Sequence, residues 1–172
     1  MKLKSVLATI SISLLALVLV IAFTAPATAQ RARKRPKPLK ETIAKKATDP
    51  QVQSDYWFDK GALCATYGND RAAINYFQKV ISIDPNRSGA YFEQGISYGQ
   101  LDDFGKAVAL VNKAIEMEPQ NGLYRYGRGR VYLLAGKQDQ AMEDFKKAAE
   151  LDDEDAQTYL MHIARLERMT NN

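Results

Sequence analysis

Small and large apolar residues return along this chain at a constant interval of 34 positions. The small residues of the series are three glycines and three alanines: Gly61, Gly95, Gly129, Ala73, Ala107 and Ala141. Larger apolar residues keep constant offsets between them. A period of this length is typical of stacked helical hairpins, so the pattern predicts three such hairpins.

The predicted hairpins span residues 54–87, 88–121 and 122–155. Their helices are expected at residues 55–67, 71–82, 89–100, 104–116 and 138–150. Asp84-Pro85 and Glu118-Pro119 end the first two hairpins, because the residue before a proline disfavours helix. Turns are expected at Gly68-Asn69-Asp70 and Gly136-Lys137. A final amphipathic helix over residues 156–170 is expected to cap the stack.

The repeated residue types fit the packing of two antiparallel helices. Gly61 opposite Ala73 would let the helices of the first hairpin approach closely, and the later pairs would do the same. Glycine inside a helix costs about 1 kcal/mol relative to alanine, which close packing must offset. The large residues fill the space between hairpins: Trp57 and Tyr91; Cys64, Tyr98 and Tyr132; Phe77, Val111 and Phe145; Ile83, Met117 and Leu151.

One 34-residue register holds for the small-residue pair, the aromatic positions and the prolines Pro85 and Pro119. Because of this shared register, the chain resembles the tetratricopeptide-repeat family. The resemblance covers Ser54 to about Met169 and implies an all-α fold, a right-handed α-solenoid. Two positions depart from the pattern in the third repeat. Arg125 stands where Trp57 and Tyr91 stand, and Asp153 stands where the prolines stand.

In this family the first helix of each repeat lines a concave groove. That resemblance implies an apolar groove with a basic spot at Arg130, formed by Phe58, Phe92, Tyr126, Leu160, Ala62, Ile96, Arg130, Ala65, Gly99 and Leu133. An apolar helix or extended segment of another protein suits such a groove. Alternatively, the row packs against the chain's own cap or N-terminal segment. The Lys and Asn pairs of chaperone-tail clamps are missing from these positions.

The first 29 residues predict a signal peptide. Lys2 and Lys4 precede an uncharged apolar run over residues 6–23, and Ala27-Thr28-Ala29 fits a cleavage site. This arrangement favours export, periplasmic or secreted. The apolar run also has the length to cross a bilayer, so a retained membrane anchor is the alternative.

Residues 30–53 predict a basic, proline-containing linker. Residues 1–53 carry ten basic and two acidic residues, whereas residues 54–172 carry fourteen and eighteen. The repeats therefore lack the basic footprint of a nucleic-acid-binding domain. A cluster in the linker suits either a solvated spacer or contact with an anionic membrane surface: Arg31, Arg33, Lys34, Arg35 and Lys37.

No catalytic constellation, metal site or cofactor motif is recognisable. Cys64 is the only cysteine, so no intramolecular disulfide can form, and we interpret it as a small buried residue. His162 is the only histidine, and no nucleophile accompanies it in a strand-turn-helix motif. The acids at residues 152–155 suit the start of the final helix, where carboxylates meet the helix dipole favourably.

Together these features predict a non-enzymatic scaffold or adaptor that acts outside the cytoplasm and binds an apolar segment of another protein. The alternative is a membrane-anchored assembly factor or a self-associating module that uses its basic linker. Nucleic-acid binding and enzymatic activity have the least support.

Overall fold

The computed structural model describes residues 48–170, which form seven α-helices and no β-strand. The helices are α3 (Pro50–Thr66), α4 (Asp70–Ile83), α5 (Ser88–Gln100), α6 (Phe104–Met117), α7 (Gly122–Leu134), α8 (Gln138–Glu150) and α9 (Glu154–Thr170). The expected all-α fold is therefore confirmed. The predicted signal peptide or anchor and the basic cluster lie outside the described residues.

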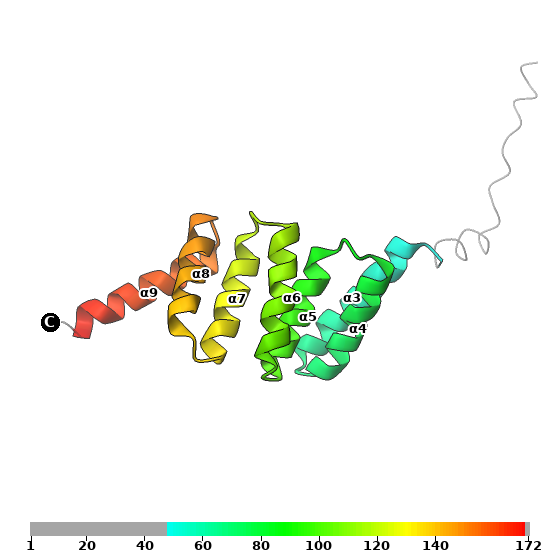
Figure 1. The fold of residues 1–172 in the computed structure, drawn as a ribbon, viewed down its shortest axis with the longest axis horizontal. Coiled ribbons are helices and arrows are strands. Elements are labelled where there is room, and N and C mark those ends of the chain that lie inside the picture. The colour runs from blue at the N-terminus through cyan, green and yellow to red at the C-terminus, as the bar shows by residue number, and fades with distance from the viewer. Residues whose placement is uncertain (1–47, 171–172) are drawn as a thin grey trace, which may run out of the picture. The chain divides into compact units, whose positions relative to one another are not determined.

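The helices stack in chain order (Figure 1). Helices α3 and α4, α5 and α6, and α7 and α8 each pack together as a hairpin. Neighbouring hairpins meet where α4 contacts α5 and α6 contacts α7, and α9 packs on α8. The first helices α5 and α7 also contact each other directly, and this contact positions the site described below.

Two helices begin earlier than expected. Helix α3 begins at Pro50, because Asp49 caps it by accepting a hydrogen bond from the Gln51 amide at 2.9 Å. Proline is tolerated in a first helical turn, where its missing amide would be unpaired anyway. Helix α9 begins at Glu154, and Asp153 accepts a hydrogen bond from the Ala156 amide at 2.9 Å. The other predicted helix ends agree to within one residue.

The three repeated glycines let the helices of each hairpin approach closely, but their main neighbours differ from those expected. A Cβ built on Gly61 would lie 2.7 Å from the Phe77 ring, and one on Gly129 would lie 2.6 Å from the Phe145 ring. At Gly95 the nearest atom is Val111 Cγ2, at 2.8 Å. The glycines thus face the large residue of the second helix, rather than chiefly the repeated alanine.

Polar contacts at one repeated position join the hairpins. Gln94 of α5 donates a hydrogen bond to the Gln78 side chain on α4 at 3.2 Å. The residue 34 positions later, Arg128 of α7, donates to the Asn112 side chain on α6 at 2.6 Å. Arg128 also donates to both carboxylate oxygens of Asp144 on α8, at 2.7 and 2.6 Å. Each hairpin after the first is thereby tied to the one before it.

Candidate functional site

The predicted groove row does not form one exposed surface. Phe92 of α5 is 7% exposed and belongs to the hydrophobic core. A Cβ built on Gly127 of α7 would lie 2.3 Å from Phe92 Cε2, so the ring occupies the space that the missing side chain leaves. Phe92 therefore supports the groove from within and offers little surface to a ligand.

The rest of the row is half-buried. Phe58 meets the Phe77 ring edge-on, with ring centroids 5.5 Å apart, and the Arg87 guanidinium lies 4.2 Å from the centroid of the Phe58 ring. Tyr126 packs on Phe145, with centroids 5.4 Å apart. Leu160 is half-buried on α9. Phe58 and Tyr126 thus pack on aromatic rings of the second helices, and Phe58 also contacts the Arg87 side chain.

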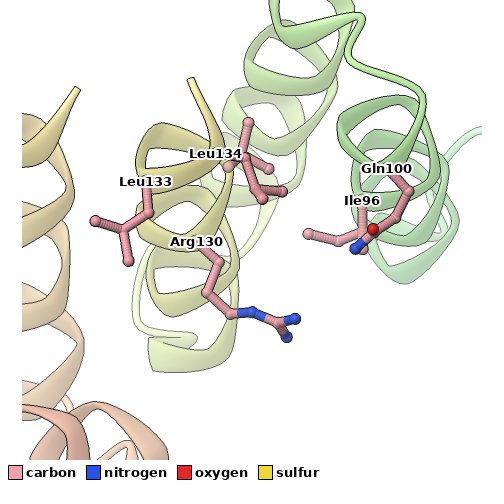
Figure 2. A pocket seen from close by; sticks show the side chains of 6 residues that line it. Ile96, Gln100, Arg130, Leu133 and Leu134 are labelled. Atoms are coloured by element: carbon pink, nitrogen blue, oxygen red, sulfur yellow. The ribbon is translucent and has the colours of Figure 1, made fainter. Parts of the chain in front are cut away.

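A pocket of about 410 Å³ lies between α5 and α7, beside this row. Figure 2 shows Ile96 and Gln100 on α5 facing Arg130 on α7. The complete lining is Ile96, Gln100, Arg130, Val131, Leu133 and Leu134. Three predicted groove residues, Ile96, Arg130 and Leu133, are thus brought together, whereas Ala62 is half-buried on α3 and does not line the pocket.

The pocket has a buried floor and an exposed rim. Val131 is 2% exposed, and a Cβ built on the adjacent Gly99 would lie 3.2 Å from Val131 Cγ2. At the rim, Leu134 is 55% exposed and Arg130 is exposed as well. The arrangement suits an apolar side chain in the pocket, with an acidic or carbonyl group of the ligand beside the Arg130 guanidinium.

Sequence reasoning missed three pocket residues: Gln100, Val131 and Leu134. Gln100 follows Ile96 by four positions, and Leu134 follows Arg130 by four, so each lies one helical turn further along the same face. That spacing was a usable signal. Val131 carries no such signal, because its place in the pocket depends on how closely α7 approaches Gly99.

Two carboxyl groups near the packed first helices have shifted pKa values. Burial raises the pKa of Glu93, which follows Phe92 on α5. The pKa of Glu118 is lowered because its carboxylate accepts hydrogen bonds from the hydroxyl of Ser88 and the side-chain amide of Asn121. Neither carboxyl group lines the pocket.

The candidate reactive residues lie apart from the pocket. Cys64 is half-buried on α3, and His162 is exposed on α9. Within residues 48–170, no group of three His, Cys, Asp or Glu side chains is placed to hold a metal ion. Across the same residues, every helix is too short or too polar to span a bilayer.

Comparison with known proteins gives the family of the repeats. Two profiles described as tetratricopeptide repeat match residues 54–87 and 92–156. Anaphase-promoting complex subunit 3 of Schizosaccharomyces pombe is 33% identical over 79 residues, which are 46% of this chain and 12% of that protein. Hsc70-interacting protein 1 of Drosophila melanogaster is 34% identical over 86 residues, 49% of this chain and 22% of that protein. The chain thus spans less than a quarter of either relative.

Solved structures agree on the fold. The first TPR domain of Spaghetti (RPAP3), bound to an HSP90 peptide, has a TM-score of 0.59 at 21% identity, covering 70% of this chain and 96% of that chain. MamA has a TM-score of 0.54 at 24% identity, covering 68% of each chain. An O-GlcNAc transferase of Thermobaculum terrenum has a TM-score of 0.57 at 22% identity, covering 60% of this chain and 20% of that chain. The chain therefore contains tetratricopeptide repeats and has the all-α TPR solenoid fold.

Proposed function

We propose that this protein is a non-enzymatic scaffold that binds a segment of another protein in the pocket between α5 and α7. Its TPR relatives support a role in protein–protein interaction. The observation that carries the proposal is the juxtaposition of the apolar side chains Ile96, Leu133 and Leu134 with the exposed Arg130 guanidinium. The proposed binding site lies on the first helices, like the predicted groove, and near the C-terminal ends of α5 and α7.

The lining defines the chemistry of the ligand. One apolar side chain of the partner enters the pocket, and an aspartate or glutamate next to it pairs with Arg130. Burial of one such side chain contributes about 1.5 to 3 kcal/mol. Association itself costs about 4 to 15 kcal/mol, which is more than one buried side chain contributes. The ion pair with Arg130 and further contacts of the segment must supply the rest, so we expect weak binding.

We further propose that the protein acts outside the cytoplasm. The support is the N-terminal sequence alone, in which a basic head, the apolar run over residues 6–23 and Ala27-Thr28-Ala29 resemble a cleaved signal peptide. The alternative is a retained anchor, with the basic cluster from Arg31 to Lys37 contacting anionic lipid headgroups. N-terminal sequencing of the protein from its own cells distinguishes the two, because cleavage leaves Gln30 as the first residue.

Selection of random peptides displayed on phage tests the pocket directly. The full chain is the bait, and the enriched peptides are titrated against purified variants. We expect enriched peptides to pair an apolar residue with a neighbouring acid. Arg130→Gln should weaken the binding of acidic peptides about tenfold. When the acidic residue of the peptide is replaced by its amide, the same substitution should leave the affinity unchanged.

A matched control separates the pocket from exposed apolar surface in general. Leu134 is 55% exposed at the pocket rim, and Met161 is 66% exposed on α9, outside the pocket. Leu134→Asp should abolish binding, whereas Met161→Asp should leave it intact. Equal binding of the enriched peptides to the wild type and to Leu134→Asp would contradict the proposal.

A further inference from the structure

Glu93 is a half-buried acidic residue of α5 that the proposed function does not yet use. Burial raises the pKa of its carboxyl group, because partial removal from water makes the charged form costly. Within residues 48–170, no hydrogen bond and no ion pair reaches this carboxylate. An opposite charge would stabilise such a group, and the described part of the chain does not supply one.

The helical period places Glu93 on the groove side of α5. It precedes Ile96 by three positions and Gln100 by seven, so the three residues share one face of the helix. Ile96 and Gln100 line the pocket and face Arg130 on α7 (Figure 2). Burial chiefly raises the pKa of Tyr124 on α7, and the Glu93 charge contributes to that rise. Glu93 therefore lies beside α7, one turn away from the pocket.

The charges on the groove side of the first helices change sign along the stack. Asp59 on α3 stands 34 positions before Glu93 and is exposed, whereas the same position on α7 is Gly127. The exposed charge that α7 contributes is the guanidinium of Arg130. Among residues 48–170, neither Asp59 nor Arg130 forms an ion pair. The groove is thus negative at α3 and α5 and positive at α7.

Two other cations of the first repeats are engaged or directed elsewhere. Arg87 is paired with Asp55, at 2.5 Å between the guanidinium nitrogen and the carboxylate oxygen. Lys60 stands at the repeat position of Gln94 and Arg128, whose side chains reach back to the preceding hairpin. The negative charge on the groove side of α5 is therefore available to a partner.

We propose that Glu93 binds a lysine or arginine of the partner, so that the groove recognises a base, an apolar residue and an acid in one segment. The inference rests on the proposed function, because it adds a residue to the same binding site. Helices α5 and α7 pack together, with axes about 8 to 10 Å apart, and Glu93 and Arg130 differ by one turn along them. An extended segment covers this distance with about three residues.

Charge complementarity selects this partner over a wholly acidic one. A segment with acids on both sides of its apolar residue would set one carboxylate against Glu93 while the other pairs with Arg130. Like charges opposed across an interface are unfavourable, and they disfavour the wrong partner. A segment with a base on one side and an acid on the other satisfies both groove charges.

An array of synthetic peptides tests the proposal, with the full chain in detergent as the binding protein. Every peptide carries a leucine next to a glutamate, and a variable position holds lysine, glutamine or glutamate. The variable position lies three residues before the glutamate in one set and three after it in the other, with the leucine between. In one of the two sets, the lysine peptides should bind about tenfold more tightly than the glutamine peptides. The glutamate peptides of that set should bind most weakly.

Substitutions at Glu93 assign the preference to this residue. Glu93→Gln keeps the size of the side chain and should remove the preference for lysine without changing the affinity of the glutamine peptides. Glu93→Lys should reverse the order, so that the glutamate peptides bind best. Glu116→Gln makes the same charge change at an exposed position of the second helix α6 and should behave like the wild type. Circular dichroism confirms that each variant is folded.

Two results would overturn this inference and leave the pocket standing. One is equal binding of the lysine, glutamine and glutamate peptides to the wild type in both sets. The other is a preference for lysine that persists in Glu93→Gln, which would assign the base to another acid such as Asp59. In both cases, binding that is lost in Leu134→Asp would still support the proposed function. Failure of every peptide in the array to bind would contradict the proposed function and this inference together.

Discussion

At the scale of the single residue, equivalent turns are built from different amino acids. Gly68 and Gly136 have positive φ angles of 72° and 73° in the turns of the first and third hairpins. Asp102 occupies the equivalent place in the second hairpin, at a φ of 61°. The left-handed region is strained for residues that carry a Cβ, so this turn is held in place by the helices around it.

Asp102→Gly should therefore stabilise the protein, by about 0.5 to 1 kcal/mol, because glycine adopts a positive φ without steric strain. Urea unfolding followed by circular dichroism measures the change. The converse substitution, Gly136→Asp, should destabilise by a similar amount. A less stable Asp102→Gly variant would mean that the aspartate side chain contributes more to the turn than its backbone strain costs.

At the scale of the helical element, the spacing of α5 and α7 depends on a glycine. The Phe92 ring lies where a side chain at residue 127 would be, and Cδ1 of Ile96, a residue that lines the pocket, lies 3.2 Å from the same position. Gly127→Ala should destabilise the fold by about 1 to 3 kcal/mol, because the new methyl group must displace the ring. Peptide binding in the pocket should weaken in parallel, as measured by titration of a selected peptide.

Gly105 provides the matched control. It also lies in a helix, but a Cβ built there has no neighbour within 4 Å, so Gly105→Ala should be stabilising by about 0.5 to 1 kcal/mol. Combining Gly127→Ala with Phe92→Leu should cost less than the sum of the two single changes, because the smaller side chain relieves the collision. If the changes in the free energy of unfolding were additive, residues 92 and 127 would not be energetically coupled.

Prediction from sequence succeeded for the helices and found three of the six residues that line the pocket between α5 and α7. The 34-residue period located the hairpins because each needs small residues at its helix crossing and large ones around it. The predicted start of α3 was too late. Asp49-Pro50 resembles the end of a repeat, but in the structure Asp49 caps the helix that begins at Pro50. Phe92 shares its repeat position with the half-buried Phe58, and its burial depends on contacts with Gly127, 35 residues away, and with Tyr124.

At the scale of the whole molecule, the stability of the stack should depend on pH through Glu118. Its hydrogen bonds from Ser88 and Asn121 lower its pKa below the ordinary value of 4.5, so the folded state holds this proton less tightly than the unfolded state. The resulting stabilisation is complete above the unfolded pKa. It is lost as the pH falls through the lower, folded pKa.

Urea unfolding of the wild type and of Glu118→Gln across this pH range measures the effect. The wild type should be the more stable protein at neutral pH, and the difference should disappear in acid. The substitution keeps the size of the side chain and removes its charge. A difference that stays constant with pH would show that the Glu118 charge does not contribute to the stack.

The polar contacts at Gln94 and Arg128 also bear on how the molecule comes apart. Arg128 holds an acceptor in its own hairpin and another in the hairpin before it, and Gln94 reaches back in the same way. When one hairpin unfolds, the side chain of Gln94 or Arg128 loses a hydrogen-bond partner in the neighbouring hairpin. The polar group left unpaired is one that the stack had shielded from water. Neighbour coupling of this kind makes unfolding cooperative along a solenoid. The three repeats therefore behave as one thermodynamic unit, and a cut between any two of them weakens both fragments.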